Sequence, residues 1–231
     1  MREHRRTFLP AAGRDWLLPL YDTFVKLLGG DAARAELLAQ ADMRSPARIL
    51  EIGCGTGSLV ILIKRLHPDV EVVGLDPDPR ALTRGRRKAA RAGVSVQFEE
   101  GFSDTLPYPA ESFDLVFSSF MFHHLRTDEQ EKTLREVRRV LKPGGCLHLL
   151  DFVGQAFHPH GVHGFLARVV HGAGRPGHSH DRPILALMSE AGFADSKDIS
   201  RRATPIGRVA YYRAFVPAGE ISSTTSAGGV G

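Results

Sequence analysis

The sequence predicts an α/β fold in which helices cover both faces of a doubly wound, mostly parallel, seven-stranded sheet. From residue 47 to residue 152, apolar segments of strand length alternate with segments of helical periodicity. Such alternation is typical of parallel strands joined by right-handed crossovers. Two further strand-like stretches follow near the end of the chain. The 231 residues, 42% of them hydrophobic, suffice for one such domain with a continuous core.

The N-terminal part predicts two helices over residues 14–41, with a break at Gly29 and Gly30. The apolar side chains that recur there near helical spacing are Trp16, Leu17, Leu20, Phe24 and Leu27. We expect residues 1–45 to form a helical cap on the main domain.

The main domain follows as an alternation of strands and helices. Strands are expected at Ala47–Ile52, Glu71–Asp76, Val94–Glu100, Phe113–Ser119 and Cys146–Val153. Between these strands we expect one helix that ends at His67, a second over Pro79–Ala92 and a third over Thr127–Leu141. After them we expect a helix at Arg182–Ala191, ended by Gly192, and strands near 194–200 and 208–216.

The composition indicates how the chain after residue 45 is organised. We expect the main domain over residues 46–217, with a Gly- and His-rich, lid-like insertion at 154–180 and a disordered tail at 218–231. No run of about 18 apolar residues occurs, and the first residues are too polar for a signal peptide. We therefore expect a cytoplasmic protein without a membrane span. Cys54 and Cys146 do not suggest a disulfide framework.

The net charge of +4 comes partly from one predicted helix that is strongly basic. Its basic residues are Arg80, Arg84, Arg86, Arg87, Lys88 and Arg91. No aromatic residues interleave them to stack on bases, so we interpret them as a solvated helix face rather than a nucleic-acid surface.

Histidines crowd the predicted insertion, but they do not predict a metal site. They are His158, His160, His163, His171, His178 and His180. Only Asp181 lies nearby to complete a ligand shell, and no cysteine does. We expect no bound metal.

The segment Arg48–Leu59, RILEIGCGTGSL, runs from a strand through three glycines into a helix. Such a turn lets a ligand approach the backbone. Asp76 ends the next strand, 19 residues beyond Gly57, where a carboxylate can accept both hydroxyls of a ribose. Ser58 replaces the third glycine of a dinucleotide-binding loop, and Glu51 suits an ammonium group. The pattern favours a nucleoside with an amino acid end over a dinucleotide.

Four blocks carry a resemblance to a known family: LEIGCGTG, GLDPDP, LPYPAESFDLVFSSFMFHHL and LREVRRVLKPGGCLHLLDF. Over about residues 14–152 the chain resembles the class I S-adenosylmethionine-dependent methyltransferases, in the branch with quinone and other small-molecule methyltransferases. The resemblance implies a Rossmann-like fold and S-adenosylmethionine as cofactor. It places the loop against the methionine portion, through Gly53, Cys54, Gly55 and Gly57. Glu51 would lie behind the ammonium, Asp76 on the ribose and Pro77 against the adenine.

One block departs from the family pattern. Many relatives have Gly-Asp-Ala where this chain has Gly101, Phe102 and Ser103, so the carboxylate that accepts from the adenine amino group is missing. We expect Phe102 to close over the adenine, with an oxygen from Ser103 or Asp104 at its edge. We also assign Ser118 and Ser119, at the end of the fourth predicted strand, to the cofactor site.

His123 and His124 are the candidate catalytic residues, because they follow the carboxyl end of the fourth strand, where open α/β sheets bind ligands. The alternative is that they are packing or helix-capping residues. The neighbouring run Phe120–Phe122 fits either an apolar pocket wall or core.

We therefore expect methyl transfer by in-line displacement to a small, apolar or aromatic acceptor. The target atom (oxygen, nitrogen or carbon) and the oligomeric state stay open. The alternative functions are a non-catalytic S-adenosylmethionine-binding regulatory module and an RNA methyltransferase.

Overall fold

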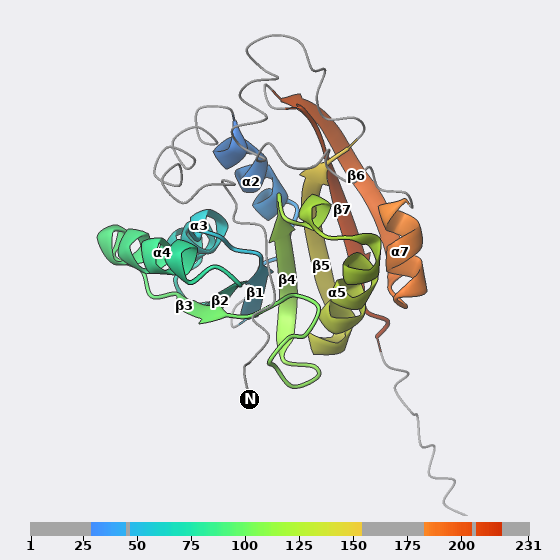
Figure 1. Cartoon of the computed structure of the whole chain (residues 1–231), viewed down its shortest axis with the longest axis horizontal. Helices are drawn as coiled ribbons and strands as arrows, with labels where there is room; N and C mark the ends of the chain where they lie inside the picture. The colour runs from blue at the N-terminus through green and yellow to red at the C-terminus, as the bar shows by residue number, and fades with distance from the viewer. Residues whose placement is uncertain (1–28, 45–46, 154–182, 205–206, 219–231) are drawn as a thin grey trace, which may run out of the picture.

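The computed structural model describes residues 29–44, 47–153, 183–204 and 207–218 (Figure 1). The first helix expected within residues 14–28, the insertion at 154–180 and residues 219–231 lie outside these ranges. No helix in the described ranges is long and apolar enough to span a membrane.

The described residues form a seven-stranded sheet in the order β3-β2-β1-β4-β5-β7-β6, which confirms the predicted fold class. The strands are β1 (Arg48–Ile52), β2 (Glu71–Asp76), β3 (Gln97–Glu100), β4 (Phe113–Ser119), β5 (Leu141–Phe152), β6 (Ala194–Thr204) and β7 (Gly207–Phe215). Strands β1 to β5 pair in parallel, whereas β7 is antiparallel to both β5 and β6. Helices separate β1 from β2, β2 from β3 and β4 from β5, and a segment without a helix joins β3 to β4, as predicted. The last two strands form a hairpin.

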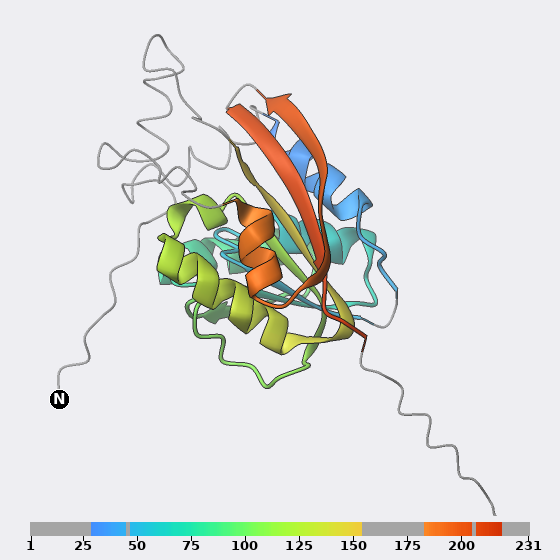
Figure 2. The same cartoon turned by 90° about the vertical axis from the view of Figure 1, so that its right-hand side faces the viewer.

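Helices cover both faces of this sheet (Figures 1 and 2). One face carries α2 (Gly30–Ala39), α3 (Ser58–Leu66) and α4 (Pro79–Ala92), and the other carries α5 (Thr127–Val140) and α7 (Ile184–Glu190). A short 3-10 helix, η2 (Phe122–His124), follows β4. Two apolar clusters, one on each face, form the core.

Local sequence explains where α4 begins and ends. The Asp78 side chain caps its first turn by accepting from the Arg80 N–H at 2.9 Å. Pro79 occupies the first helical position, where the missing N–H is harmless. Gly93 ends the helix at φ 66°, a left-handed conformation that glycine adopts without strain. Helix α4 therefore begins three residues after Asp76, the last residue of β2.

Helix α2 is the described part of the expected N-terminal cap, and it lies in the same layer as α3. The carboxylate of Glu36 ties it to the sheet, since it accepts from the Tyr211 hydroxyl at 3.1 Å and pairs with Arg202 at 2.8 Å. This attachment holds α2 over the strands that end near His123.

Parallel pairing brings the carboxyl ends of β1, β2, β4 and β5 to one edge of the sheet. Ile52 of β1 is in register with Ser118 of β4, and Ser119 is in register with Leu150 of β5. This edge carries the glycine turn, Asp76 and His123, as expected for ligand sites of open parallel sheets.

Candidate functional site

The three glycines of the turn after β1 all adopt left-handed backbone conformations, with φ 65° at Gly53, 53° at Gly55 and 76° at Gly57. Their surroundings differ. A Cβ at Gly53 would lie 2.2 Å from Cγ of Met121, and one at Gly57 would lie 2.6 Å from the Phe98 ring. Apart from its two chain neighbours, no atom of the described residues would lie within 4 Å of a Cβ at Gly55. Packing thus accounts for Gly53 and Gly57, whereas Gly55 faces space that the described residues leave open.

Glu51 points from β1 into the interior beside this turn and is only 1% exposed. Its Oε1 accepts from the Ser119 hydroxyl at 2.8 Å, while its Oε2 has no hydrogen-bond partner in the part of the chain that the structure describes. Burial raises the pKa of Glu51 to about 7, against the opposing effects of Ser119 and Arg34. A buried oxygen without a partner is costly, so Glu51 fits a ligand that brings a donor such as an ammonium.

Asp76, the last residue of β2, links this strand to the glycine turn. Its Oδ2 accepts from the Gly55 N–H at 2.8 Å, and its Oδ1 accepts from the Asp78 N–H at 2.9 Å. Burial raises the pKa of Asp76 to about 6, although both backbone bonds oppose the shift. Each carboxylate oxygen can accept a second bond, so the predicted contact with ribose hydroxyls is compatible with this geometry.

Of the remaining predicted cofactor residues, some contact other parts of the protein and others are partly exposed. The Cys54 thiol is buried and packs against β2, since a Cβ at Gly74 would lie 2.9 Å from its sulfur. Ser103 shares a 2.9 Å hydrogen bond with the hydroxyl of Thr133 in α5. Pro77 and Phe102 are half-buried, with part of their surface accessible to a ligand.

The two serines at the end of β4 point to opposite faces of the sheet, because side chains alternate along a strand. Ser119 shares the α3 face with Glu51, to which it donates. Ser118 follows Val116 on the α5 face, where its hydroxyl is buried and has no hydrogen-bond partner within the described ranges. Of the two, Ser119 is the one in contact with another predicted site residue.

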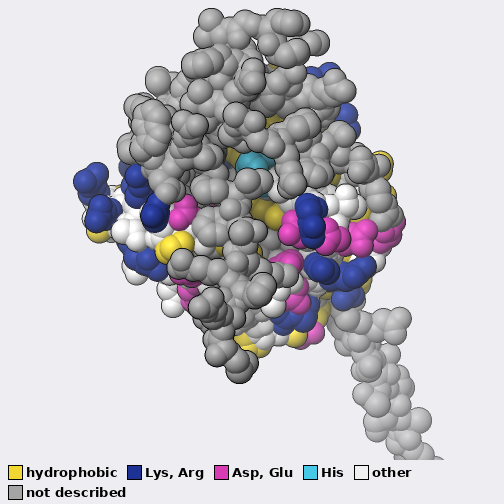
Figure 3. All heavy atoms as spheres, viewed as in Figure 1, with side chains coloured by type: hydrophobic (Ala, Val, Ile, Leu, Met, Phe, Trp, Pro, Cys, Tyr) yellow, Lys and Arg dark blue, Asp and Glu magenta, His cyan; other side chains and the backbone are white. Residues whose placement is uncertain are grey.

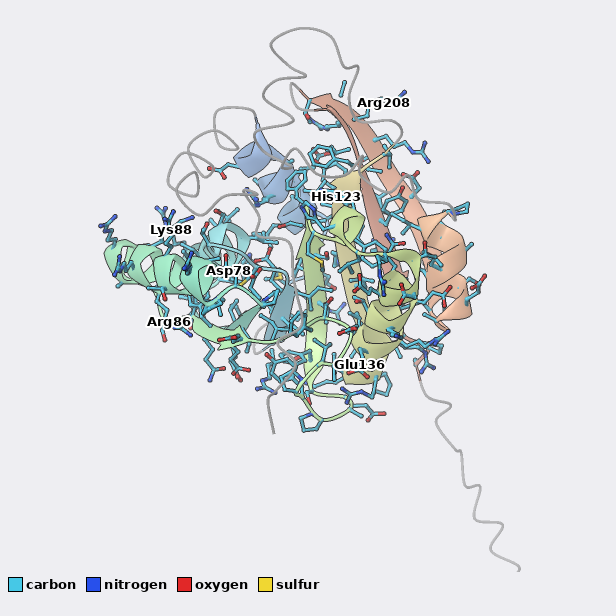
Figure 4. All side chains as sticks on the ribbon, in the orientation of Figure 1. Asp78, Arg86, Lys88, His123, Glu136 and Arg208 are labelled. Carbon is cyan, nitrogen blue, oxygen red and sulfur yellow. The ribbon has the colours of Figure 1, made fainter. Side chains whose placement is uncertain are left out.

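The imidazole of His123 is held by Asp151, near the end of β5. Its Nδ1 lies 2.5 Å from Oδ1 of Asp151, and its backbone N–H donates to Oδ2 at 2.7 Å. Asp151 is fully buried and accepts at Oδ1 from the Phe152 N–H as well. A carboxylate at Nδ1 fixes the ring and favours the tautomer with its proton there, which leaves Nε2 as the basic nitrogen. Figure 4 shows His123 at the ends of β4 and β5.

Aromatic rings surround this pair of residues. The ring centroid of His123 lies 4.0 Å from that of His124 and 5.3 Å from that of Phe152. The Phe120 ring lies 5.2 Å from Phe152, and Phe120 holds a left-handed backbone at φ 56°. Such a conformation is strained for a bulky residue and is often found at functional sites. Phe122, in contrast, is buried in the core on the α5 face.

Two residues of this region, Asp151 and Arg34, were not predicted from the sequence. Asp151 stands near the end of the strand beside β4, which is a signal that the block CLHLLDF contained. Arg34 lies on α2, and its guanidinium carbon is 5.3 Å from the Phe120 ring centroid. Nothing in the local pattern of α2 indicated its position.

The basic residues of α4 are only partly a solvated face. Arg86 donates to the Phe98 carbonyl at 2.7 Å, and Lys88 donates at 3.0 Å to the hydroxyls of both Thr56 and Ser58, which flank Gly57 (Figure 4). Lysines and arginines gather over α4, whereas acidic and basic side chains intermix over α5 (Figure 3). Lys88 thereby fastens α4 to the glycine turn.

Within the described ranges, no three His, Cys, Asp or Glu side chains are grouped so as to hold a metal ion. The histidines of the predicted insertion, from His158 to His180, lie outside those ranges. The metal-free prediction for that segment stays a prediction.

Comparison with known families and sequences identifies several similar proteins. A family model described as a methyltransferase domain matches residues 49–145. A demethylmenaquinone methyltransferase of Thermus thermophilus is 38% identical over 156 residues, which cover 66% of this chain and 69% of that protein. A demethylmenaquinone methyltransferase of Deinococcus radiodurans is 40% identical over 139 residues, 59% of this chain. The chain spans 57% of the length of that protein.

Among solved structures, the YcgJ protein of Bacillus subtilis superimposes with a TM-score of 0.67. The match covers 81% of this chain and 99% of that one at 20% identity. At this identity the similarity shows the fold alone.

Proposed function

Because the chain belongs to the class I S-adenosylmethionine-dependent methyltransferases, we propose that it methylates a small acceptor that carries an aromatic hydroxyl group. S-adenosylmethionine is the methyl donor of this family. Two relatives are named demethylmenaquinone methyltransferases. A quinone carries aromatic hydroxyl groups in its reduced, hydroquinone form, and this supports an acceptor of this class. The pairing of His123 with the buried Asp151 is the observation that carries the proposal.

The glycine-turn half of the edge would bind the cofactor. Gly55 faces the open space beside the turn, and Asp76 holds the turn against β2. Glu51 offers its unpartnered Oε2 to the ammonium of the methionine portion, and Asp76 offers its remaining acceptor positions to the ribose. We assign the half-buried Pro77 and Phe102 to the adenine.

The His123 half would activate the acceptor. When bound, S-adenosylmethionine supplies an electrophilic methyl group on a positively charged sulfur. His123 accepts the hydroxyl proton of the acceptor at Nε2, because Asp151 keeps the ring proton at Nδ1. Asp151 then stabilises the imidazolium that forms. The rings of Phe120 and Phe152 exclude water and favour a flat, apolar acceptor.

A panel of small phenols, hydroquinones and aliphatic alcohols, each supplied with S-adenosylmethionine, tests this function. We expect release of S-adenosylhomocysteine with aromatic hydroxyl compounds and not with the alcohols. His123→Asn should lower turnover about 100-fold or more, with cofactor affinity unchanged. The matched control is His124→Asn. This variant should keep turnover near the wild-type rate, because the carboxylate of Asp151 contacts the ring of His123.

Two outcomes would contradict the proposal. Wild-type turnover by the His123→Asn variant would make the histidine a packing residue. Tight cofactor binding without turnover on any acceptor, small molecule or RNA, would instead support the non-catalytic binding module.

A further inference from the structure

Helix α2 brings a nearly buried arginine to the predicted cofactor site. The side chain of Arg34 is 12% exposed, and its guanidinium carbon lies 5.3 Å from the Phe120 ring centroid. Phe120 directly follows Ser119, whose hydroxyl donates to Glu51. Arg34 and Glu51 therefore approach the end of β4 from two different elements.

Arg34 and Glu51 are near each other, but they do not form an ion pair. Arg34 acts electrostatically to lower the pKa of Glu51, against the larger effect of burial. Its ion pair among the described residues is with Asp31, one turn earlier in α2, at 3.6 Å, and the Asp31 side chain is 50% exposed. Such a half-exposed pair contributes little and does not explain why a guanidinium is withdrawn from water.

This arrangement of one anion and one cation matches a zwitterion. The methionine portion of the cofactor carries an ammonium and a carboxylate on the same carbon atom. Glu51 has an unpartnered oxygen for the ammonium, and a guanidinium presents paired N–H donors that match a carboxylate. Two opposite charges at separate points would also fix the orientation of that portion.

We propose that Arg34 binds the carboxylate of the cofactor's methionine portion, so that α2 forms one wall of the cofactor site. The inference rests on the proposed function, because it requires that S-adenosylmethionine binds at the glycine turn. The competing explanation is structural: Arg34 would only hold Phe120 in place through the contact of its cation with the ring.

A cofactor analogue separates these explanations. Decarboxylated S-adenosylmethionine lacks the carboxylate and retains the amine, the sulfonium and the nucleoside. Calorimetric titration of both ligands into the wild type and into Arg34→Met measures what the carboxylate contributes with and without the guanidinium. We expect the wild type to bind S-adenosylmethionine about 10- to 100-fold more tightly than the analogue, as for hydrogen bonds between charged groups.

Arg34→Met should lose that preference. Its affinity for S-adenosylmethionine should fall about 10- to 100-fold, while its affinity for the analogue changes less than about threefold. Retained binding of the analogue also shows that the variant is folded. The control is Arg44→Met, because Arg44 is exposed and pairs with Asp42, so both affinities should stay at wild-type values.

Each alternative result overturns the inference in a recognisable way. An equal loss for both ligands would mean that Arg34 only supports Phe120 or the turn. Unchanged affinities in Arg34→Met would mean that the guanidinium does not contact the cofactor. If the wild type bound neither ligand, the proposed function would fail, and this inference with it.

Discussion

The two halves of the candidate site, the glycine turn and the region of His123, both contain a buried carboxylate, but the carboxylates are paired differently. In the glycine-turn half, Glu51 accepts from the Ser119 hydroxyl at one oxygen, and its other oxygen has no hydrogen-bond partner among the described residues. In the histidine half, Asp151 accepts from the ring and the backbone of His123 and from the backbone of Phe152. The first arrangement leaves an acceptor for a ligand, and the second fixes the orientation of a neighbouring side chain.

This difference separates binding from orientation. A carboxylate that lacks donors is costly until a cation arrives, so Glu51 is suited to ligand binding. A carboxylate whose oxygens are already engaged gains nothing from a ligand, so Asp151 is suited to holding His123. Variants in the first half should change cofactor affinity, and variants in the second half should change turnover.

The largest effect is expected for Gly55→Arg, in the glycine-turn half. A side chain at this position would enter the space beside the turn, because no described residue other than its chain neighbours has an atom within 4 Å of a Cβ there. We expect no measurable binding of S-adenosylmethionine by calorimetry. An arginine held at the left-handed φ of 53° found at Gly55 would add strain of only about 1–3 kcal/mol, so we expect the variant to fold. Wild-type affinity in a folded Gly55→Arg variant would place the cofactor elsewhere.

The next effect is expected for Asp151→Asn, in the histidine half. An amide can donate to Nδ1 of His123 and so favour the tautomer whose Nε2 already carries a proton. Turnover should fall about 100-fold or more, while the dissociation constant of S-adenosylmethionine stays within about twofold. A loss of cofactor affinity equal to the loss of turnover would remove the distinction between the halves.

The proximity of the glycine turn to Asp76 could be predicted from the sequence because its signals are local. The run from Glu51 to Gly57 is contiguous, and Asp76 follows at the end of the next strand. Parallel pairing of β1 with β2 then brings Asp76 to the turn, where it accepts from Gly55. The order of strands and helices along the chain could be predicted as well, because hydrophobic periodicity is also a local signal.

The histidine half depended on contacts between distant segments. His123 was a candidate from its place after β4, but Asp151 is 28 residues further along the chain. Their contact requires that β4 and β5 are neighbours in the sheet, which alternation alone does not specify. Arg34 requires the position of α2 on the sheet, and no local pattern in that helix encodes it. The different surroundings of the three glycines could not be predicted for the same reason. Met121 and Phe98, which pack against Gly53 and Gly57, come from other elements.

The smallest of these effects is a pH dependence of cofactor binding that arises from Glu51. Burial raises its pKa from 4.5 to about 7, so near neutral pH a substantial fraction of the cofactor-free protein carries a protonated Glu51. An ammonium ligand prefers the ionised carboxylate, so the apparent affinity scales with the ionised fraction. The raised pKa also means that the stability contributed by protonated Glu51 is lost as pH rises from 4.5 to about 7.

Titrations of S-adenosylmethionine at several pH values test this dependence. With a pKa of about 7, Glu51 is about one-tenth ionised at pH 6 and about nine-tenths ionised at pH 8, so affinity should rise about tenfold over this range. Glu51→Gln should bind more weakly at pH 8 and lose most of the rise. A smaller change near pH 6 should persist in that variant, because the pKa of Asp76 is raised to about 6. If Glu51→Gln kept the full tenfold rise, Glu51 would not be the group that meets the ammonium, and the unpartnered oxygen would need another explanation.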